Sequence, residues 1–449
     1  MSAIEMTSGR FESTAAEVVD RIRDEGLGLI DLVFSDITGG AKALTIPSAL
    51  VERTLERGYR FDGSALTGGL RSVELDLYLM PDPATFAVLT PGVAEERRGR
   101  LCCSVLRRDG QPFDGDPRSA LERVIARATQ AGFDYRVGIE MEYYLLKGDW
   151  THLAVERDSA GYFDFGEDAV SRTRDSIISS LASTGVGLGG AHHETGPGQE
   201  EIDLRPTSAL RMADQLITVR QTIRTAARQF GLRATFMPKP FTDAPGSGVH
   251  VFQQFRQVDS GNDLLRDEFD GLSPAAMQII GGQVAHAPAM CAVLCPTVNS
   301  YKRLNAGHRA PRYANWAHVS QTSMIRVPSV LSGGAASIEL RSQDALANPY
   351  LALAVALSAA LDGISHGIEP PDPLDESFSS YDDAGLERIG VQRLPGTLGE
   401  ALESFAQDQV VQEALGSYIS DQLLTVKRAE WEEYRAVVGP WEHRRYGDA

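Results

Sequence analysis

Apolar residues recur at helical spacing near the start of the chain, where they mark one face of a helix over residues 13–25 that ends before Gly26. Residues 28–47 then alternate between apolar and polar, which is typical of two strands joined by a tight turn at residues 37–40. Patterns of the same kinds predict a helix at residues 48–57 and strands at residues 75–80, 86–89 and 100–106. This opening part therefore predicts a small α+β domain of roughly 110 residues.

Glycine, proline and aspartate are concentrated in residues 110–118, which we interpret as a linker. Beyond it, long helical patterns alternate with short strand patterns. The predicted helices are residues 119–130, 169–183, 209–230, 275–294, 349–364, 400–411 and 421–434. The predicted strands are residues 135–146, 199–205, 233–238, 247–254 and 337–344. The fold class is therefore α+β, with one domain at residues 14–110 and a second, built on antiparallel strands, at residues 117–449.

Composition narrows the class of protein but not its function. The chain has 449 residues, of which 43% are hydrophobic and 23% charged, and this is ordinary for a soluble globular protein of two unequal domains. No run of about 18 apolar residues occurs that would cross a membrane, and the first residues lack the basic start and apolar core of a secretory signal. The four cysteines form no metal-type set with histidine, so reduced thiols in a cytoplasm are the simplest interpretation.

The net charge is −18, from 61 acidic and 43 basic residues. This excess of acid argues against nucleic acid and anionic membranes as partners, because both carry negative charge. A surplus of acid usually serves solubility alone. The alternative is that some carboxylates gather around cations, which the positions of the acidic residues can test.

Two glutamates, Glu140 and Glu142, are spaced two apart in a strand pattern that is otherwise apolar. Residues two apart on a strand project from the same face, so these carboxylates repel each other and lose hydration unless a cation lies between them. For one such pair alone, a solvent-facing edge with polar alternation is the simpler explanation. The pattern recurs, however, and the further candidate ligands are Glu194 in the string HHETG, Glu201 in QEEIDLR, His250 after a Gly-Ser-Gly turn and Glu339 in SIELRS.

Five carboxylates and one imidazole favour hard divalent ions, Mg²⁺ or Mn²⁺, because a zinc site would use more histidine or cysteine. Three arginines, Arg303, Arg326 and Arg341, lie in otherwise apolar segments. A lone arginine there is more often a structural ion-pair partner. Three of them near a metal cluster are better interpreted as clamps for the anionic groups of a phosphorylated intermediate.

Several strings, in this order along nearly the whole chain, resemble the glutamine synthetase family. They are FDGSALTG (61–68), LMPD (79–82), GIEMEYYLL (138–146), HHETGPGQEEIDLR (192–205), ATFMPKPFTDAPGSGVH (234–250), NSYKRL (299–304) and ELRSQDALANPYL (339–351). The Ala-Pro-Gly-Ser-Gly form at residues 244–248 and the string RAEWEEYR at residues 428–435 look most similar to actinobacterial γ-glutamylpolyamine synthetase-like members.

The resemblance implies a β-grasp-like N-terminal domain and a catalytic domain whose curved antiparallel sheet is flanked by helices. It also implies a homo-oligomer, a dodecamer of two stacked hexameric rings in which neighbouring subunits share each active site. The implied reaction joins glutamate to a small-molecule amine, with ATP as co-substrate and two or more Mg²⁺ or Mn²⁺ ions per site.

The resemblance also implies a role for each candidate residue. One metal ion would be held by Glu142, Glu194 and Glu201, and the other by Glu140, His250 and Glu339. Glutamate would contact Gly246, His250, Arg303 and Arg341. Catalysis would further use Arg326, which faces the nucleotide phosphates, and Asp62, which reaches into the neighbouring subunit's site to position the incoming amine.

The reaction that the resemblance implies has two steps. Metal ions and arginines draw the γ-phosphate of ATP toward the side-chain carboxylate of glutamate, which gives γ-glutamyl phosphate. An amine then attacks the activated carbonyl, and a closed site favours amidation over hydrolysis.

Five positions depart from the family pattern. Phe252, at the nucleotide-phosphate side, replaces the second histidine of a His-x-His motif, and Gln321 replaces an arginine that contacts the γ-phosphate. Arg309 stands where the family flap carries a glutamate that accepts the proton of the amine, so an acid has become a base. Ala65 replaces the second serine of Phe-Asp-Gly-Ser-Ser, and the basic residues that usually precede the Glu-x-Arg strand are missing around Ser337.

These departures leave three interpretations open. The chain is an active ligase whose acceptor is not ammonia, with Arg309 pairing with an anionic group on the acceptor or swinging outward. Alternatively, it is an ordinary glutamine synthetase that tolerates the changes, although losing one partner of the transition state typically costs about 10²–10³ in rate. The third interpretation is a scaffold or sensor that binds metal and ligand and catalyses weakly.

Overall fold

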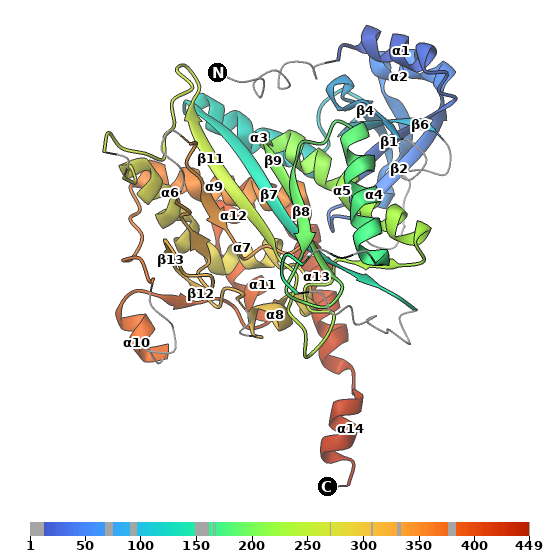
Figure 1. Ribbon diagram of the computed structural model, residues 1–449. Helices are drawn as coiled ribbons and strands as arrows, with labels where there is room; N and C mark the ends of the chain where they lie inside the picture. Colours follow the sequence, from blue (N-terminus) through green and yellow to red (C-terminus); the bar gives the residue numbers. More distant parts are fainter. Residues whose placement is uncertain are drawn as a thin grey trace.

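Two large β-sheets organise the protein (Figure 1). The computed structural model describes residues 13–448 except 68–74, 90–96, 149–160, 165, 167, 270, 307–308, 330–333 and 376–382, and it leaves the side chains at 65, 67, 383, 384 and 387 undescribed. The first sheet lies near the N-terminus and the second forms the centre of the larger part of the chain (Figure 1). The predicted α+β class is confirmed.

The first sheet has the strand order β2-β1-β6-β4-β3, with β5 paired to β6. Its strands are β1 (Leu29–Ser35), β2 (Ala41–Pro47), β3 (Tyr59–Asp62), β4 (Asp76–Pro81), β5 (Ala87–Leu89) and β6 (Arg98–Leu106). The predicted hairpin is confirmed, because β1 and β2 pair antiparallel along their whole length. Helices α1 (Ala15–Asp24) and α2 (Val51–Arg57) pack Val18, Ile22 and Val51 into the core beneath this sheet. The predicted helices at residues 13–25 and 48–57 are thus confirmed to within a few residues.

The second sheet has the strand order β13-β14-β15-β11-β7-β9-β8, with β10 paired to β7. Its strands are β7 (Phe133–Leu146), β8 (Leu188–His193), β9 (Gln199–Ser208), β10 (Arg233–Thr235), β11 (Val249–Gln257), β13 (Trp316–Ala317), β14 (Ile325–Arg326) and β15 (Ile338–Leu340), and a separate pair joins β12 (Tyr313–Ala314) to β16 (Gln392–Arg393). The three long strands β7, β9 and β11 run side by side through its middle (Figure 1). Strands β3, β8, β12, β13, β14 and β16 were not predicted.

Two predicted strands are shorter than expected, for reasons visible in their backbone groups. The carbonyls of the segment after β15 accept hydrogen bonds from the side chain of Arg303, which competes with a regular ladder beyond Leu340. The segment after β10 contains Pro238 and Pro240, which have no N–H to donate to a neighbouring strand.

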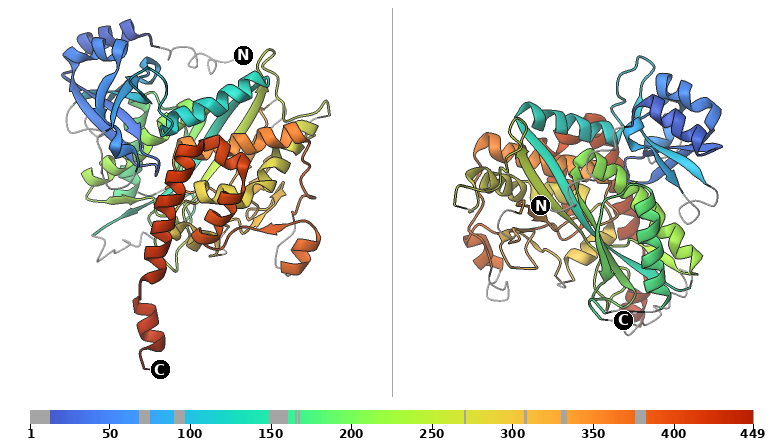
Figure 2. Two further views of the ribbon diagram at one scale, coloured as in Figure 1. Left: turned by 180° about the vertical axis from the view of Figure 1, so that it is seen from behind. Right: turned by 45° about the horizontal axis from the view of Figure 1, so that its top comes forward.

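Helices cover one face of the second sheet, as the rear view in Figure 2 shows. The helices of this part of the chain are α3 (Pro117–Gln130), α4 (Ala169–Ser183), α5 (Ala209–Gln229), α6 (Pro274–Ala285), α7 (Ala287–Leu294), α8 (Val298–Leu304), α9 (Pro349–His366), α10 (Asp383–Arg388), α11 (Leu398–Gln407), α12 (Gln409–Leu415), α13 (Ser417–Ala436) and α14 (Pro440–Tyr446). The end of α13 and α14 extend away from the body of the protein. Along β7, the side chains of Ile139, Met141 and Tyr143 enter the core shared with these helices. Because neighbours on a strand point to opposite faces, the residues between them are directed away from the helices.

Two helices predicted as continuous are broken. Residues 274–294 form α6 and α7, which meet at an angle of 72°, and Pro288 near the start of α7 has no N–H to donate to the preceding turn. The predicted helix at residues 400–411 divides at Asp408, which has extended backbone and caps α12 through Val411. No single described helix is long and apolar enough to cross a membrane, and the α6–α7 pair reaches that length only across its bend.

The imidazole of His286 joins three helices at this bend. Its Nδ1 atom lies 2.7 Å from Oδ2 of Asp408 at the start of α12, and its Nε2 atom lies 3.1 Å from Oδ2 of Asp362 in α9. Burial alone would lower the pKa of His286, but the hydrogen bonds with the two carboxylates outweigh it and the pKa is raised. A charged imidazole can donate both of its N–H groups to these acceptors.

We therefore expect the stability of this helical layer to fall as the pH rises. A group whose pKa is raised by folding stabilises the protein below its unfolded value, about 6.5 for histidine, and this contribution is lost as the pH rises through the folded value. The urea midpoint should drop from about pH 6 to about pH 9 in the native protein and drop less in His286→Gln. His366→Gln is the control, because His366 also pairs with Asp362 but is exposed. Parallel profiles for the native protein and His286→Gln would contradict this role.

Arg118 in α3 connects the first sheet to the helical layer through a set of ion pairs. Its guanidinium lies 2.6 Å from Asp82, which follows β4, and donates to the Ser104 hydroxyl in β6 at 2.9 Å. On the other side it makes two bonds to Asp214 in α5, at 3.1 and 3.0 Å. Tyr350 of α9 donates to the same carboxylate at 2.6 Å. One cation thus holds the N-terminal sheet against two helices of the second layer.

The hairpin turn of the first sheet also rests on the segment that follows β15. Asn348 donates to the carbonyl of Asp36 at 2.8 Å, and Arg220 donates to the carbonyls of Gly39 and Ala345. Gly39 has φ +84°, and a Cβ there would lie 2.9 Å from the backbone of Asn348. The turn therefore requires glycine both for its conformation and for this close approach.

Candidate metal centre and active site

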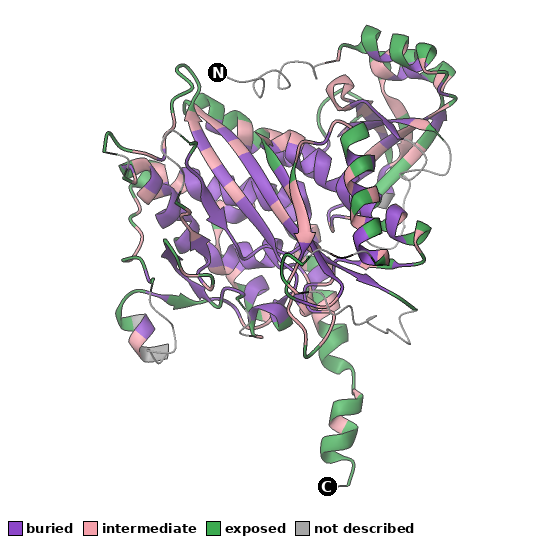
Figure 3. Ribbon diagram, viewed as in Figure 1, coloured by how far each residue is buried: buried purple, intermediate pink, exposed green. Residues whose placement is uncertain are grey.

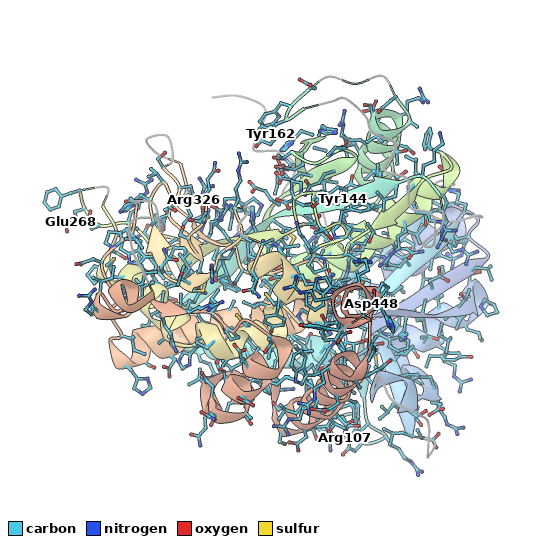
Figure 4. All side chains as sticks on the ribbon, turned by 90° about the horizontal axis from the view of Figure 1, so that it is seen from below. Arg107, Tyr144, Tyr162, Glu268, Arg326 and Asp448 are labelled. Atoms are coloured by element: carbon cyan, nitrogen blue, oxygen red, sulfur yellow. The ribbon has the colours of Figure 1, made fainter. Side chains whose placement is uncertain are left out.

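The face of the second sheet away from the helices carries a cavity of about 510 Å³. Its lining is dominated by charged and aromatic side chains, namely Glu140, Glu142, Tyr162, Phe163, His192, Glu194, Thr195, Gln199, Glu201, Asp203, Pro245, Gly246, His250, Arg303, Arg309, Ala310, Gln321, Arg326 and Arg341. Tyr162 and Arg326 lie on the same side of the molecule, opposite the C-terminal helices (Figure 4). Five of the six residues predicted as metal ligands line this cavity, and the sixth, Glu339, is fully buried.

One group of ligands forms where β7, β11 and β15 lie side by side. Glu140 faces His250 across the β7–β11 ladder, and the Nδ1 atom of His250 lies 3.1 Å from Oε2 of Glu140 and 3.4 Å from Oε1 of Glu339. One ligand atom from each of the three residues lies within 4.8 Å of the others. This is the trio expected for one of the two metal ions.

Electrostatics in this trio suit a cation. Burial, reinforced by the charge of Glu339, raises the pKa of Glu140 to about 7. Burial and the nearby Arg341 lower the pKa of His250 far below its usual value, so the imidazole is neutral and has a nitrogen lone pair free to coordinate. A divalent ion between these groups would relieve the repulsion that raises the pKa of Glu140.

A second group forms between β7, β9 and the turn after β8. Glu142 faces Glu201 across the β7–β9 ladder, and a ligand atom of Glu194 lies within 4.8 Å of both. Burial raises the pKa of Glu142 to about 8, against the opposing charge of Arg303, and Glu201 contributes to the rise. The Gly248 N–H donates to Glu142 at 2.7 Å and fixes the position of this carboxylate. This is the trio expected for the other ion.

A third group, which was not predicted, lies beside the second. His192, Glu201 and Asp203 also bring ligand atoms within 4.8 Å, and the Nε2 atom of His192 is 3.1 Å from Oε1 of Glu201. Asp203 is two residues beyond Glu201 on β9, so its side chain is on the same face. The sequence carried this signal, because the spacing that linked Glu140 to Glu142 also links Glu201 to Asp203.

The donors in the two expected trios could hold Mg²⁺ or Mn²⁺. Five of the six are carboxylates, the ligand type that these hard ions prefer. Burial raises the pKa values of Glu140 and Glu142, and the neighbouring carboxylates add to the rise, so a bound cation would stabilise their charged forms. The residues present therefore fit the ions that the sequence suggested.

Three arginines frame the carboxylates. Arg303 is buried on α8 and donates to the carbonyls of Arg341, Ser342 and Gln343 at 3.1, 3.0 and 3.3 Å. Arg341 and Arg326 both form ion pairs with the fully buried Glu339. The arginines thus lie beside the ligand groups, as expected from the sequence.

Glycines make room for Arg303. A Cβ at Gly246 would lie 2.8 Å from the Arg303 side chain, and one at Gly248 would lie 2.3 Å from its guanidinium. Gln199 donates to the Gly246 carbonyl at 3.0 Å, which holds this turn at the edge of the cavity. The backbone at Gly246 therefore borders the cavity beside Arg303, where the sequence placed it.

The other predicted site residues divide into two sets. Arg309 and Gln321 line the cavity, and both are exposed. Phe252 is not among the residues that line it; it lies on β11 opposite Glu339, two residues beyond His250. Asp62 lies in β3 and lines a different cavity, of about 610 Å³, beside the first sheet. Its carboxylate accepts from Ser64 N–H at 3.0 Å and Leu75 N–H at 3.2 Å.

Two more positions, Ala65 and Ser337, were named because they depart from the family pattern. The Ala65 side chain is outside the described part of the chain, and Ser337 is buried just before β15. Trp316 is buried, does not line the cavity, and donates to the Pro371 carbonyl at 2.7 Å. A structural role explains Trp316.

Comparison with known proteins finds two family models that together match nearly the whole chain. The family model described as "Glutamine synthetase, beta-Grasp domain" matches residues 27–108, and the one described as "Glutamine synthetase, catalytic domain" matches residues 114–446. The chain is 39% identical to the glutamine synthetase of Halobacterium salinarum, over 98% of its own length and 99% of that protein. It is 38% identical to the glutamine synthetase of Thermotoga maritima, over 96% and 99% of the two chains.

Solved structures are similar as well. The chain superposes on a structure titled as the GmaS/ADP complex, in its first conformation, with a TM-score of 0.86 and 30% identity, over 96% of its own length and 99% of that chain. A ligand-free GmaS structure gives a TM-score of 0.84 at 31% identity, with the same coverage.

Proposed function

This chain belongs to the glutamine synthetase family of carbon–nitrogen ligases, and we propose that it forms a γ-glutamyl amide from glutamate and an amine other than ammonia. Family membership confirms the expected β-grasp and catalytic domains and the expected class of enzyme. The relatives from Halobacterium salinarum and Thermotoga maritima are both named glutamine synthetase, and the proposal departs from that name only in its acceptor.

The observation that carries the proposal is the position of Arg309. Its side chain lines the same cavity as both trios of candidate metal ligands. A fixed positive charge at this place opposes the binding of an ammonium ion and cannot accept its proton. An amine with further groups to contact the rim would tolerate that charge, whereas ammonia has none.

Within the proposal, divalent ions are held by Glu142, Glu194 and Glu201 and by Glu140, His250 and Glu339. When bound, these ions supply positive charge that attracts and orients the phosphoryl group in transfer. The carboxylates must be deprotonated to coordinate, and His250 is already neutral. The closeness of the ligand atoms, within 4.8 Å in each trio, supports this assignment.

The arginines act on the anionic partners. Arg303 and Arg341 hold the carboxylate groups of glutamate, with the Gly246 backbone at their side, and Arg326 faces the phosphates of ATP near Gln321. Arg303 is positioned for this because three backbone carbonyls anchor its guanidinium without neutralising it. Arginine is suited to both anions because its planar fork matches carboxylate and phosphate oxygens.

The proposed reaction has two steps. The side-chain carboxylate of glutamate attacks the γ-phosphorus of ATP, forming a C–O–P linkage as the bond to ADP breaks. The amine nitrogen then forms the C–N bond while the C–O bond to phosphate breaks. The products are the γ-glutamyl amide, ADP, inorganic phosphate and one proton released to solvent.

A second candidate function is ordinary glutamine synthesis from ammonia. It is favoured by the relatives from Halobacterium salinarum and Thermotoga maritima, both named glutamine synthetase and both aligned over nearly the whole chain. We rank it second because Arg309, Gln321 and Phe252 depart from the residues that the family resemblance implies at these positions.

The proposal extends to the assembly and location of the protein. Neighbouring subunits of a dodecamer would share each site, with Asp62 of one reaching the cavity of the next. The distance of Asp62 from the cavity within its own chain, where it lines a separate hollow, supports a role in a neighbour's site. We also propose that the enzyme is cytoplasmic. Its proposed domains are residues 14–110 and 117–449, because the last strand of the first sheet ends at Leu106 and α3 begins at Pro117.

Phosphate release from Mg²⁺-ATP and glutamate tests the proposed function directly. The acceptors to compare are ammonium, polyamines, ethanolamine, aromatic amines and amino acids, with the γ-glutamyl product identified by mass spectrometry. We expect at least one organic amine to exceed ammonium by more than about tenfold in kcat/KM. Turnover with ammonium alone would establish the second candidate. No turnover with any acceptor, while Mn²⁺ still binds, would overturn the ligase and leave a scaffold.

A further inference from the structure

Two residues at the rim of the cavity have a backbone conformation that side chains disfavour. Among the described residues, Phe163 with φ +64° and Arg309 with φ +54° are the only ones other than glycine with positive φ. Both line the cavity that holds the candidate metal ligands. Strained backbone of this kind persists where the surrounding structure enforces it, and it gathers at binding and catalytic sites.

Phe163 belongs to an aromatic wall on one side of the rim. Its ring lies 4.2 Å from that of Tyr162 and 4.4 Å from the imidazole of His192, measured between centroids. Its N–H donates to the His193 carbonyl at 3.2 Å, which ties this turn to the end of β8. Tyr162 and Phe163 are nevertheless 50% and 63% exposed. Two large aromatic side chains held in place and open to solvent at a cavity offer a flat surface for an apolar ring.

Charge at the rim has two signs. Tyr162 and Phe163 line the same cavity as Glu140, Glu194, Glu201 and Arg309. Burial raises the pKa of the Tyr162 hydroxyl, the three glutamates add to the rise, and Arg309 acts in the opposite direction. An amine nitrogen, positive before it reacts, suits the acidic side of the rim, and a carboxylate suits Arg309.

We propose that Tyr162, Phe163 and Arg309 form the acceptor subsite, and that the acceptor is a primary amine carrying both an apolar ring and an anionic group. Aromatic amino acids and aminomethylbenzoates are compounds of this class. The inference rests on the proposed function and adds the class of acceptor. The ring stacks on Phe163 and Tyr162, the anionic group pairs with Arg309, and the nitrogen points to the acidic side where the acyl phosphate forms.

Matched pairs of acceptors test the inference with the native enzyme. Phenylalanine is compared with phenethylamine, and 4-(aminomethyl)benzoate with benzylamine, by phosphate release and product mass. We expect the anionic member of at least one pair to have a kcat/KM about tenfold or more above its neutral-tailed partner. Equal use of both members of each pair, or preference for the neutral-tailed members, would overturn the inference while leaving the proposed ligase activity intact. Failure of every amine would instead overturn the proposed function.

Variants assign the effect to single residues. Arg309→Gln should remove the preference for the anionic acceptor, and Arg309→Glu should shift preference toward cationic amines. Arg312→Gln is the matched control, because Arg312 is an exposed arginine three residues away that does not line the cavity. An unchanged ranking of acceptors in both Arg309 variants would overturn its role.

Phe163→Gly separates recognition from structure. Glycine adopts positive φ freely, so the variant should unfold at the same or a higher temperature. If the ring binds the acceptor, KM for the aromatic acceptor should rise about tenfold with kcat little changed. Phe269→Gly is the control for losing an exposed aromatic ring, since Phe269 is 90% exposed outside the cavity. A lower melting temperature with unchanged KM would show that Phe163 is structural and would overturn its role in binding.

Discussion

Glu201→Gln is expected to weaken Mn²⁺ binding by at least about tenfold and to lower turnover by about 10²–10³-fold. Glu201 contributes a ligand atom both to the group with Glu142 and Glu194 and to the group with His192 and Asp203. Glutamine keeps the size of the side chain but loses the negative charge that a divalent ion requires. Calorimetric titration with Mn²⁺ and the rate of phosphate release measure the two effects.

The matched control is the preceding residue. Glu200 is fully buried on the same strand, but its side chain points to the opposite face, where both of its oxygens contact Arg174 at 3.1 and 2.9 Å. Glu200→Gln should therefore destabilise the fold, by about 1–3 kcal/mol, and leave Mn²⁺ affinity unchanged. If the two variants lost metal binding equally, Glu201 would have no special role as a ligand.

Arg118→Ala is expected to lower the free energy of unfolding by about 3–5 kcal/mol. The side chain of Arg118 is only 4% exposed and contacts Asp82 and Asp214, so its removal leaves the buried Asp214 carboxylate without its cation. Tyr350 would remain as a single neutral donor to Asp214. Urea unfolding measures the loss, which should appear as a lower midpoint.

Arg107→Ala provides the comparison for this prediction. Arg107 also pairs with an aspartate, Asp114, at 3.0 Å, but both side chains are largely exposed. Such a pair contributes about 0–1 kcal/mol, so the midpoint should hardly change. An Arg118 variant as stable as the Arg107 variant would show that these ion pairs do not hold the first sheet against the helices.

The helices near the C-terminus are far more exposed than the ion pairs around Arg118. Helix α14 and the end of α13 stand away from the body, and most of their surface is open (Figure 3). The sequence predicted a helix at residues 421–434, whereas α13 runs from Ser417 to Ala436 and α14 follows it. A helix with little packing is difficult to delimit from sequence, because its apolar pattern is weak.

Much of the site could be predicted because its pattern is local. Glu140 and Glu142 share a face because of the two-residue period of a strand, whatever the strand pairs with. The same period would have found Asp203 beside Glu201. Tyr162 and Phe163 carried no such signal, since a turn places its side chains according to the backbone that it packs against, and here that backbone is the end of β8.

The bend between α6 and α7 could not be predicted from the local sequence pattern. Residues 274–294 are mostly apolar on both sides of the bend at His286, so hydrophobicity gave no sign of it, although Pro288 was visible. A proline near the first turn of a helix is tolerated, and its presence alone does not decide between a kink and a new helix. The packing of His286 between Asp362 and Asp408 accompanies the bend that the chain adopts.

By itself, the sequence determined the family, the α+β class, the six candidate metal ligands and the departures at Phe252, Arg309 and Gln321. These follow from residue identity, spacing and local periodicity. Only the tertiary structure decided that Glu140 lies opposite His250 and Glu142 opposite Glu201, and that Arg309 shares a cavity with the aromatic wall of Tyr162 and Phe163. The physical reason is that strand register depends on contacts between segments far apart in the chain, and a shift of one residue would turn every ligand to the other face.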